Sequence, residues 1–184
     1  VNEIIIQRIN EKYKDINWEI LSEENVKVSS QICDTNSDWL WILDPLDGTK
    51  DFIQGTGNYA MHLALNYKQK PYIGIVLIPE KEELWIAAGN KIWCENKVGY
   101  KRGASLLSNT ILKEMTIATS KNHRNVVLEK LINLLKFKKI TVMGSVGCKI
   151  ASILRGESDM YISLSLPGKS APKDWDFAAP AAIL

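Results

Sequence analysis

The chain has 184 residues, of which 46% are hydrophobic and 24% charged, so it is long and apolar enough to fold around its own core. With 23 Lys and Arg against 21 Asp and Glu, its net charge of +2 indicates neither a nucleic acid nor an acidic membrane as partner. Three widely spaced cysteines and two histidines argue against a disulfide framework, a zinc site and a multi-histidine metal site. The cysteine usage fits a reducing compartment, so we expect a cytoplasmic protein. The sequence has no apolar run that could span a bilayer and no signal peptide pattern.

The first part of the chain, about residues 1–110, has an α-then-β pattern. Apolar residues at helical spacing over Val1–Tyr13 predict an amphipathic helix, and Trp18–Leu21 predicts a short strand. The polar stretch Asn25–Asp38 has no period, so we expect a loop there. Trp39–Leu43 is a continuous apolar run, which favours a buried strand.

Four strand-like runs then predict an antiparallel meander, in which Gly89-Asn90 is a hairpin turn and the basic stretch Lys97–Arg102 is an exposed loop. The four runs are Tyr59–Tyr67, Tyr72–Pro79, Glu83–Ala88 and Lys91–Glu95.

The remaining part, residues 111–184, alternates strands and helices, with the break between the two parts in the polar stretch Gly103–Thr110. Both parts together predict a layered α/β sandwich whose sheets are covered by helices. The predicted strands are Met115–Thr119, Ile140–Met143 and Asp159–Leu164, and the predicted helices are Val127–Leu135, Cys148–Leu154 and Trp175–Leu184.

The segment Asp44-Pro45-Leu46-Asp47-Gly48-Thr49 follows the buried strand directly and carries two carboxylates. Pro45 fixes φ and Gly48 permits a tight reversal, so both carboxylates and the Leu46 carbonyl can converge on one point. Glu23 ends another predicted strand and can reach the same place. Three carboxylates at one point repel one another unless a cation lies between them, and oxygen ligands alone favour Mg²⁺.

Gly48 and Thr49 open a short predicted helix that runs to Phe52. Free N–H groups at its start would form an anion site beside the cation, and the Thr49 hydroxyl is placed to orient a water molecule. A cation beside a helix N-terminus suits a phosphate group. The alternative is that Asp44–Thr49 is an ordinary surface turn, but such a turn would not require the apolar strand Trp39–Leu43 directly before it.

A second carboxylate signal is Asp176, which stands near the start of the last predicted helix. It has two interpretations, a helix N-cap and a metal ligand, and by itself it favours the cap.

Three segments together resemble the inositol monophosphatase family of Mg²⁺-dependent phosphatases, namely Ser22-Glu23-Glu24, Trp41–Thr49 and Trp175–Ala179. The resemblance implies a layered α-β-α-β-α sandwich and a phosphoric monoester hydrolase that lithium inhibits. It implies metal binding by Glu23, Asp44, the Leu46 carbonyl, Asp47 and Asp176. It also implies that Glu23, Asp47 and Thr49 are catalytic, with the Thr49 hydroxyl helping to activate the attacking water.

Three further segments look like the 3′(2′),5′-bisphosphate nucleotidase (CysQ-type) branch, which acts in sulfur metabolism: Lys50-Asp51-Phe52, Ser120–His123 and Gly144–Lys149. Lys149 offers a positive charge to a second phosphate, and Ser145 offers a hydroxyl beside a possible helix N-terminus. Two alternatives stay open: His123 as an ordinary loop histidine and Lys149 as a solvated helix lysine. By this similarity the substrate contacts are Gly48, Thr49, Ser120, His123, Ser145, Lys149 and Asp176.

The function that follows is hydrolysis of the 3′-phosphate of adenosine 3′,5′-bisphosphate to AMP and phosphate by a metal-activated water. The alternatives are an inositol or sugar phosphatase, and an inactive nucleotide- or metal-binding fragment. Family members carry an acidic segment before the opening helix and continue beyond the Trp-Asp motif, so we expect a sandwich truncated at both ends. The expected partner is a small phosphate ester, with no nucleic acid or membrane, and family members are often homodimers.

Overall fold

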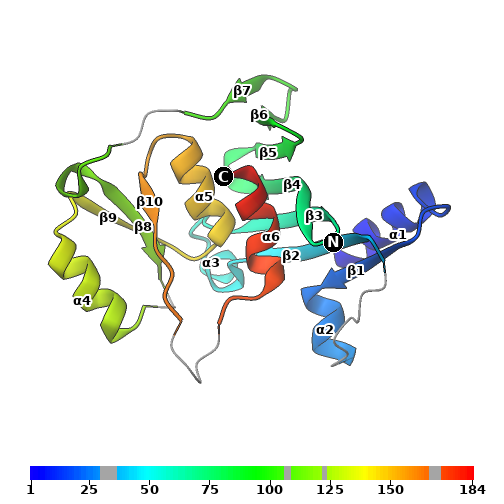
Figure 1. Ribbon diagram of the computed structural model, residues 1–184, viewed down its shortest axis with the longest axis horizontal. Coiled ribbons are helices and arrows are strands. Elements are labelled where there is room, and N and C mark those ends of the chain that lie inside the picture. Colours follow the sequence, from blue (N-terminus) through cyan, green and yellow to red (C-terminus); the bar gives the residue numbers. More distant parts are fainter. Residues whose placement is uncertain (30–36, 106–108, 122–123, 166–170) are drawn as a thin grey trace.

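A computed structural model shows two β-sheets and the helices that cover them as five layers (Figure 1). The layers are, in order, α4, a three-stranded sheet, the pair α5 and α6, a seven-stranded sheet, and α1 (Figure 1). This arrangement confirms the predicted α-β-α-β-α sandwich. The structure describes residues 1–29, 37–105, 109–121, 124–165 and 171–184. The helices are α1 (Asn2–Lys12), α2 (Glu23–Ser29), α3 (Thr49–Ile53), α4 (Val126–Leu135), α5 (Val146–Leu154) and α6 (Asp174–Ile183), with 3₁₀ turns at Pro79–Lys81 and Leu112–Glu114.

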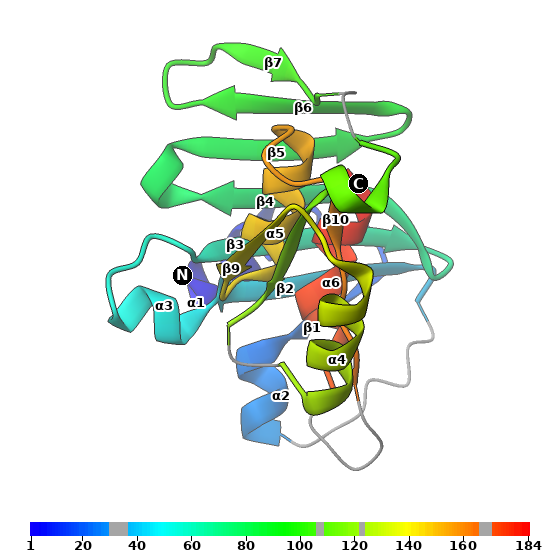
Figure 2. The same cartoon turned by 90° about the vertical axis from the view of Figure 1, so that its left-hand side faces the viewer.

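The seven strands of the larger sheet follow one another in chain order, from β1 to β7 (Figure 2). Only β1 and β2 pair parallel, and each later pair is antiparallel, so the predicted meander is confirmed. Gly89-Asn90 forms the turn between β5 and β6, as predicted. The strands are β1 (Trp18–Ser22), β2 (Trp39–Asp47), β3 (Ala60–Tyr67), β4 (Lys70–Ile78), β5 (Glu83–Ala88), β6 (Lys91–Asn96) and β7 (Lys101–Gly103).

The smaller sheet is parallel and has the order β10-β8-β9, with β8 at Thr116–Ser120, β9 at Lys139–Met143 and β10 at Met160–Tyr161. Parallel neighbours need a crossover, and α4 connects β8 to β9 while α5 connects β9 to β10. Leu128 and Ile132 of α4 are buried against Ile117 of β8, which attaches α4 to the outer face.

The main core lies between the two sheets, where α5 and α6 pack on one face of the larger sheet. Ile42 of β2 belongs to this core, whereas its neighbour Trp41 lies near Tyr13 at the end of α1, with 6.0 Å between ring centroids. Successive strand residues point to opposite faces, which explains the continuous apolar run of β2. Gly74 of β4 lies directly under α6, since a Cβ there would overlap Ala182. Because Gly74 has no Cβ, α6 can approach the sheet closely.

Three predicted boundaries are wrong. Helix α2 occupies the start of the Asn25–Asp38 stretch that we predict as loop, because Glu23 and Glu24 in its first turn favour a helix N-terminus without any apolar period. A short edge strand, β7, forms within the predicted loop Lys97–Arg102, and its residues are exposed. Strand β10 has only two residues, Met160 and Tyr161, so the predicted strand Asp159–Leu164 is too long.

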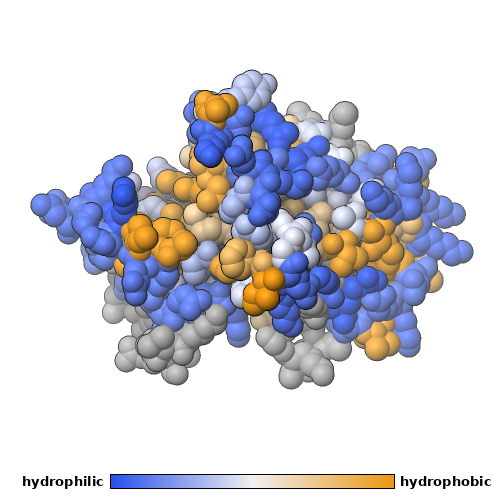
Figure 3. Space-filling view, turned by 180° about the vertical axis from the view of Figure 1, so that it is seen from behind, coloured by the Kyte–Doolittle hydropathy of each residue, from blue (hydrophilic) through white to orange (hydrophobic). Residues whose placement is uncertain are grey.

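The division of the chain near residue 110 stays a prediction, since residues 106–108 lie outside the described part. Within the described part, no helix is both long enough and apolar enough to cross a membrane. On the face shown in Figure 3, apolar side chains lie in separate groups among hydrophilic ones, which is typical of a surface in contact with water.

Candidate functional site

The two aspartates of the Asp-Pro-Leu-Asp segment point to one side of the sheet because β2 is irregular at this place. Asp44 pairs with His62 of β3, but Asp47 pairs with Ala60, so three steps on β2 match two on β3. Residues three apart in a regular strand face opposite sides, and the extra residue restores a common side. Pro45 lacks the N–H that a regular ladder would need, which suits this interruption.

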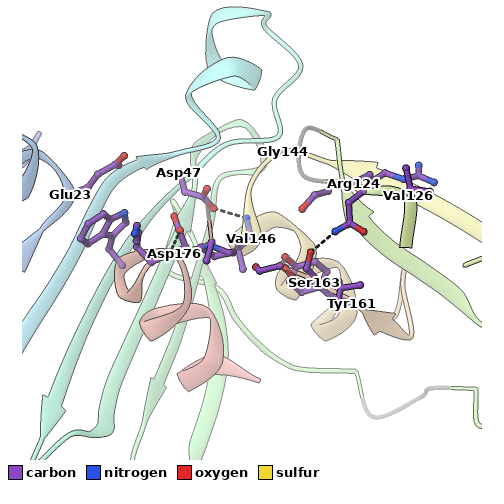
Figure 4. Close-up of a pocket in the computed structure, with 17 residues that line it drawn as sticks. Glu23, Asp47, Arg124, Val126, Gly144, Val146, Tyr161, Ser163 and Asp176 are labelled. Atoms are coloured by element: carbon purple, nitrogen blue, oxygen red, sulfur yellow. Dashed lines mark hydrogen bonds between the residues drawn. The ribbon is translucent and has the colours of Figure 1, made fainter. Parts of the chain in front are cut away.

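Three carboxylates converge where β2 meets the start of α6. One oxygen each of Asp44, Asp47 and Asp176 lies within 4.8 Å of the others. Asp44 is buried, with 1% of its surface exposed, and the other two are half-buried. Glu23, at the start of α2, lines the same cavity as Asp47 and Asp176 (Figure 4).

The proximity of these acids changes their protonation. Burial, followed by the charges of Asp47 and Glu23, raises the pKa of Asp44 to about 9. Burial also raises the pKa of Asp176, although the backbone N–H of Lys173 opposes the shift. The cluster of Asp44, Asp47 and Asp176 must hold either a proton or a cation to offset the repulsion between its carboxylates. Its ligands are oxygen atoms only, and that chemistry fits a hard divalent cation such as Mg²⁺.

The Leu46 carbonyl and Thr49 lie next to this cluster. The Thr49 hydroxyl donates to the Leu46 carbonyl at 3.1 Å, and the Leu46 N–H donates to Asp44 Oδ1 at 3.0 Å. Gly48 has a φ of 86° and precedes α3, and a Cβ there would come 2.8 Å from the Asn58 carbonyl oxygen. The left-handed conformation and the lack of space both require glycine at this turn.

Asp47 is held at the N-terminus of α5. Its Oδ2 accepts hydrogen bonds from the Ser145 hydroxyl at 2.7 Å and from the Val146 N–H at 2.6 Å, and the Gly147 N–H lies 3.4 Å away. Ser145 is also the N-cap of α5, since its hydroxyl accepts from the Cys148 N–H. The positive end of the helix dipole therefore faces a carboxylate of the protein itself.

His62 of β3 contacts the same carboxylate from the other side. Its ring is fully buried, with Nε2 3.3 Å from Asp47 Oδ2 and Nδ1 3.3 Å from the Trp175 carbonyl oxygen. Burial lowers the pKa of His62, while Asp47 and the Trp175 carbonyl act in the opposite direction. We did not predict this contact, because the sequence suggests an ordinary strand residue. One signal was present: His62 stands between Ala60 and Ala64 on the buried face, where a polar ring needs a partner.

The cluster forms one end of a cavity of about 820 Å³ between the two sheets. Arg124, Asn125 and Ser163 line the other side, and Tyr161 lies between (Figure 4). The Arg124 side chain is 24% exposed, and its guanidinium pairs with Glu129 of α4, with Nη2 2.7 Å from Oε2. The cavity thus has the acidic cluster on one side and the positively charged Arg124 guanidinium on the other.

The model of the inositol monophosphatase family matches residues 1–184, the whole chain. The chain belongs to the inositol monophosphatase family. A 3′(2′),5′-bisphosphate nucleotidase CysQ from Buchnera aphidicola is 30% identical over 165 residues, which cover 90% of this chain and 58% of that protein. Inositol monophosphatase 2 from Solanum lycopersicum is 26% identical, over 89% of this chain and 61% of that protein.

Among solved structures, inositol monophosphatase-II from Staphylococcus aureus superposes with a TM-score of 0.78 at 24% identity, over 99% of this chain and 64% of that one. The fold is therefore that of inositol monophosphatases. The chain spans less than two thirds of the length of these relatives.

Against the family pattern, the structure brings together Asp44, Asp47 and Asp176, with Glu23 on the same cavity. Ser120, at the end of β8, is buried and also lines this cavity. His123 lies outside the described residues.

Lys149 does not line the cavity. Its side chain is fully buried, and Nζ donates to the carbonyl oxygens of Gly144 at 2.9 Å and Met143 at 3.3 Å. The alternative of a solvated helix lysine is therefore wrong. Burial lowers the pKa of Lys149 to about 8. Lys149 holds the turn from β9 to α5, and its contact with substrate stays a prediction, as does that of Ser145.

Arg124 is a further residue that the sequence analysis missed. It directly follows the Ser120–His123 segment, which is the only local signal for it.

Proposed function

We propose that the protein is a Mg²⁺-dependent phosphatase that hydrolyses the 3′-phosphate of adenosine 3′,5′-bisphosphate to AMP and phosphate. The observation that carries this proposal is the convergence of Asp44, Asp47 and Asp176 within 4.8 Å at one end of a cavity. Similarity to relatives named bisphosphate nucleotidase favours this substrate over other phosphate esters.

In this proposal the acidic cluster holds Mg²⁺ through Glu23, Asp44, Asp47, Asp176 and the Leu46 carbonyl. When bound, Mg²⁺ would polarise the phosphoryl oxygens and acidify water. The N–H groups of Gly48 and Thr49 would hold the remaining phosphate oxygens. The Thr49 hydroxyl, which already contacts the Leu46 carbonyl, would orient the water that attacks phosphorus in line. Attack is direct and forms no covalent phosphoenzyme.

Arg124 supports a substrate with a second anionic group. The cavity extends from the acidic cluster to Arg124, whose guanidinium suits bidentate binding of a phosphate. Lys149 is fully buried away from the cavity, whereas Arg124 lines it, so Arg124, although paired with Glu129, is the better partner for the 5′-phosphate. We expect Arg124→Gln to raise the KM for the bisphosphate about tenfold or more and to leave the KM for inositol 1-phosphate unchanged.

The deciding experiment measures phosphate release by the full-length protein with Mg²⁺. Adenosine 3′,5′-bisphosphate should be hydrolysed with a higher kcat/KM than inositol 1-phosphate, and Asp44→Asn should abolish both activities. Equal or faster turnover of inositol 1-phosphate would establish the second candidate, an inositol phosphatase. Similarity to inositol monophosphatase 2 of Solanum lycopersicum favours that candidate.

A third candidate is a nucleotide- or metal-binding module without activity. Calorimetry separates it from an enzyme: binding of Mg²⁺ and AMP without any hydrolysis of the bisphosphate indicates the inactive module.

We also propose a cytoplasmic location, a role in sulfur metabolism, inhibition by lithium and a homodimer. The location rests on the cysteine usage, the role in sulfur metabolism on similarity to CysQ relatives, and the other two proposals on family membership. Phosphate release in the presence of LiCl tests the inhibition, and sedimentation of the full-length protein tests the dimer.

A further inference from the structure

We propose that His62 is a positioning residue, which holds Asp47 and the start of α6 in the geometry that binds the cation. The inference rests on the metal site of the proposed function and adds a residue outside the ligand set. His62 supplies no ligand to the cluster and acts through Asp47 and through the backbone beside Asp176.

The ring of His62 connects two parts of the site that are far apart in the chain. Nε2 lies 3.3 Å from Asp47 Oδ2, on β2. Nδ1 lies 3.3 Å from the carbonyl oxygen of Trp175, 113 residues later and directly before Asp176. One buried side chain of β3 therefore contacts both β2 and α6, the two elements that carry the clustered aspartates.

Close packing fixes the position of this ring. A Cβ on Gly147 would overlap the Nε2 of His62 and the side chain of Val76, so α5 presses on the ring from one side. The neighbours of His62 on the buried face of β3 are Ala60 and Ala64, which leave space for the ring. The ring is therefore packed against α5 on the side that carries Nε2.

The contacts of Asp47 divide its two oxygens. Within the described residues, Ser145, Val146, Gly147 and His62 all approach Oδ2. This side of the carboxylate is thus held by the protein, so the proposal assigns Oδ1 to the cation. Groups that orient a ligand in this way change metal affinity about 10- to 100-fold when they are removed.

A purely structural role does not explain a histidine at this position. Nε2 is buried and has no hydrogen bond of good geometry within the described residues, although Asp47 lies at contact distance. A buried polar atom without a hydrogen bond lowers stability, and an apolar side chain of similar volume would avoid that cost. A neutral imidazole carries one N–H, and with that proton on Nε2 the ring donates toward Asp47 Oδ2, which is the contact that gives the ring its function.

The test compares three variants of the full-length protein by calorimetric titration with MgCl₂ and MnCl₂. His62→Leu removes both ring nitrogens and should weaken cation binding about tenfold or more. His62→Gln returns an amide near the position of Nε2 and should keep the affinity within about threefold of the wild type. Val76→Ala is the matched control: Val76 is buried and pairs with His62 across the sheet, but it offers no polar atom.

Circular dichroism shows whether each variant is folded. Cation affinity of His62→Leu within about twofold of the wild type overturns the inference, as does equal weakening in Val76→Ala. A wild-type protein that binds Mg²⁺ but hydrolyses no phosphate ester removes the proposed function and leaves this comparison intact. If the wild type binds neither cation, the metal site itself is wrong, and the role of His62 with it.

Discussion

In the proposed site, a proton and the metal ion compete for the carboxylate of Asp44. Because its pKa is raised to about 9, the metal-free protein keeps this proton at neutral pH, and Mg²⁺ must displace it. We expect the apparent Mg²⁺ affinity to rise with pH by up to about tenfold per unit between about pH 6 and about pH 8. Calorimetry in buffers of different ionisation enthalpy measures both the affinity and the proton released. A constant affinity would contradict the prediction.

The same proton makes the stability of the metal-free protein depend on pH. The unfolded chain loses it near the ordinary value of 3.8, whereas the folded chain keeps it to about 9. The stabilisation is therefore complete below about pH 4 and is lost progressively as the pH rises toward 9. Denaturant unfolding in EDTA at several pH values should follow this decline, and Asp44→Asn, which carries no such proton, should flatten it.

Asp47 has a different role in the cluster, since its Oδ2 already accepts hydrogen bonds at the start of α5. In Asp47→Asn the amide presents NH₂ either to those N–H donors or to the cation, and both arrangements are unfavourable. We expect Mg²⁺ affinity to fall about 100-fold or more, with the fold intact and the free energy of unfolding reduced by about 1–3 kcal/mol. Metal affinity that survives the substitution would remove Asp47 from the ligand set.

The sequence predicts the residues of the cluster better than their surroundings. Asp44 and Asp47 are close in the chain and follow a strand, so their convergence is a local property of the Asp-Pro-Leu-Asp segment. His62 and Arg124 join the site only through strand register and the packing of the two sheets, which no local pattern contains. For Lys149 the local sequence is misleading: it suggests an ammonium group available to a phosphate, but the fold buries this side chain.

Among the elements, α5 connects stability to the metal site. Ser145 caps this helix and also donates to Asp47, so Ser145→Ala should lower the free energy of unfolding by about 1 kcal/mol and weaken Mg²⁺ binding about tenfold. Asn125 caps α4 in the same way but does not contact the cluster. Asn125→Ala should lower stability by a similar amount with unchanged Mg²⁺ affinity. Urea unfolding and calorimetry measure the two effects, and equal metal binding in both variants would contradict the connection.

Elements with a strong period are predicted well, and elements stabilised by pairing or charge are not. The meander strands alternate buried and half-buried residues, and α4 has a clear apolar stripe, so their ranges are nearly correct. Strand β7 exists because it pairs with β6, and its own three residues, Lys101–Gly103, carry no apolar signal. Helix α2 likewise begins at two acidic residues rather than at an apolar stripe.

At the scale of the whole molecule, a cation bound as proposed would join the larger sheet to the last helix through Asp44, Asp47 and Asp176. A ligand that binds only the folded state stabilises it, by about 2.7 kcal/mol at a hundred times its Kd. For a chain of 184 residues this should raise Tm by about 5–10 °C. Differential scanning calorimetry with MgCl₂ and with EDTA measures the shift, and Asp44→Asn should show none. An identical Tm in both conditions would mean that the folded protein does not bind the cation.

The position of α6 in the chain has a consequence for biosynthesis. Asp176 and the Trp175 carbonyl reach the ribosomal exit only after both sheets have been translated, yet the helix that carries them packs against strands made much earlier. A nascent chain that still lacks this helix has no complete set of the proposed ligands. In the proposed site, tight binding of the ion therefore has to wait until α6 has been translated and has packed on the larger sheet.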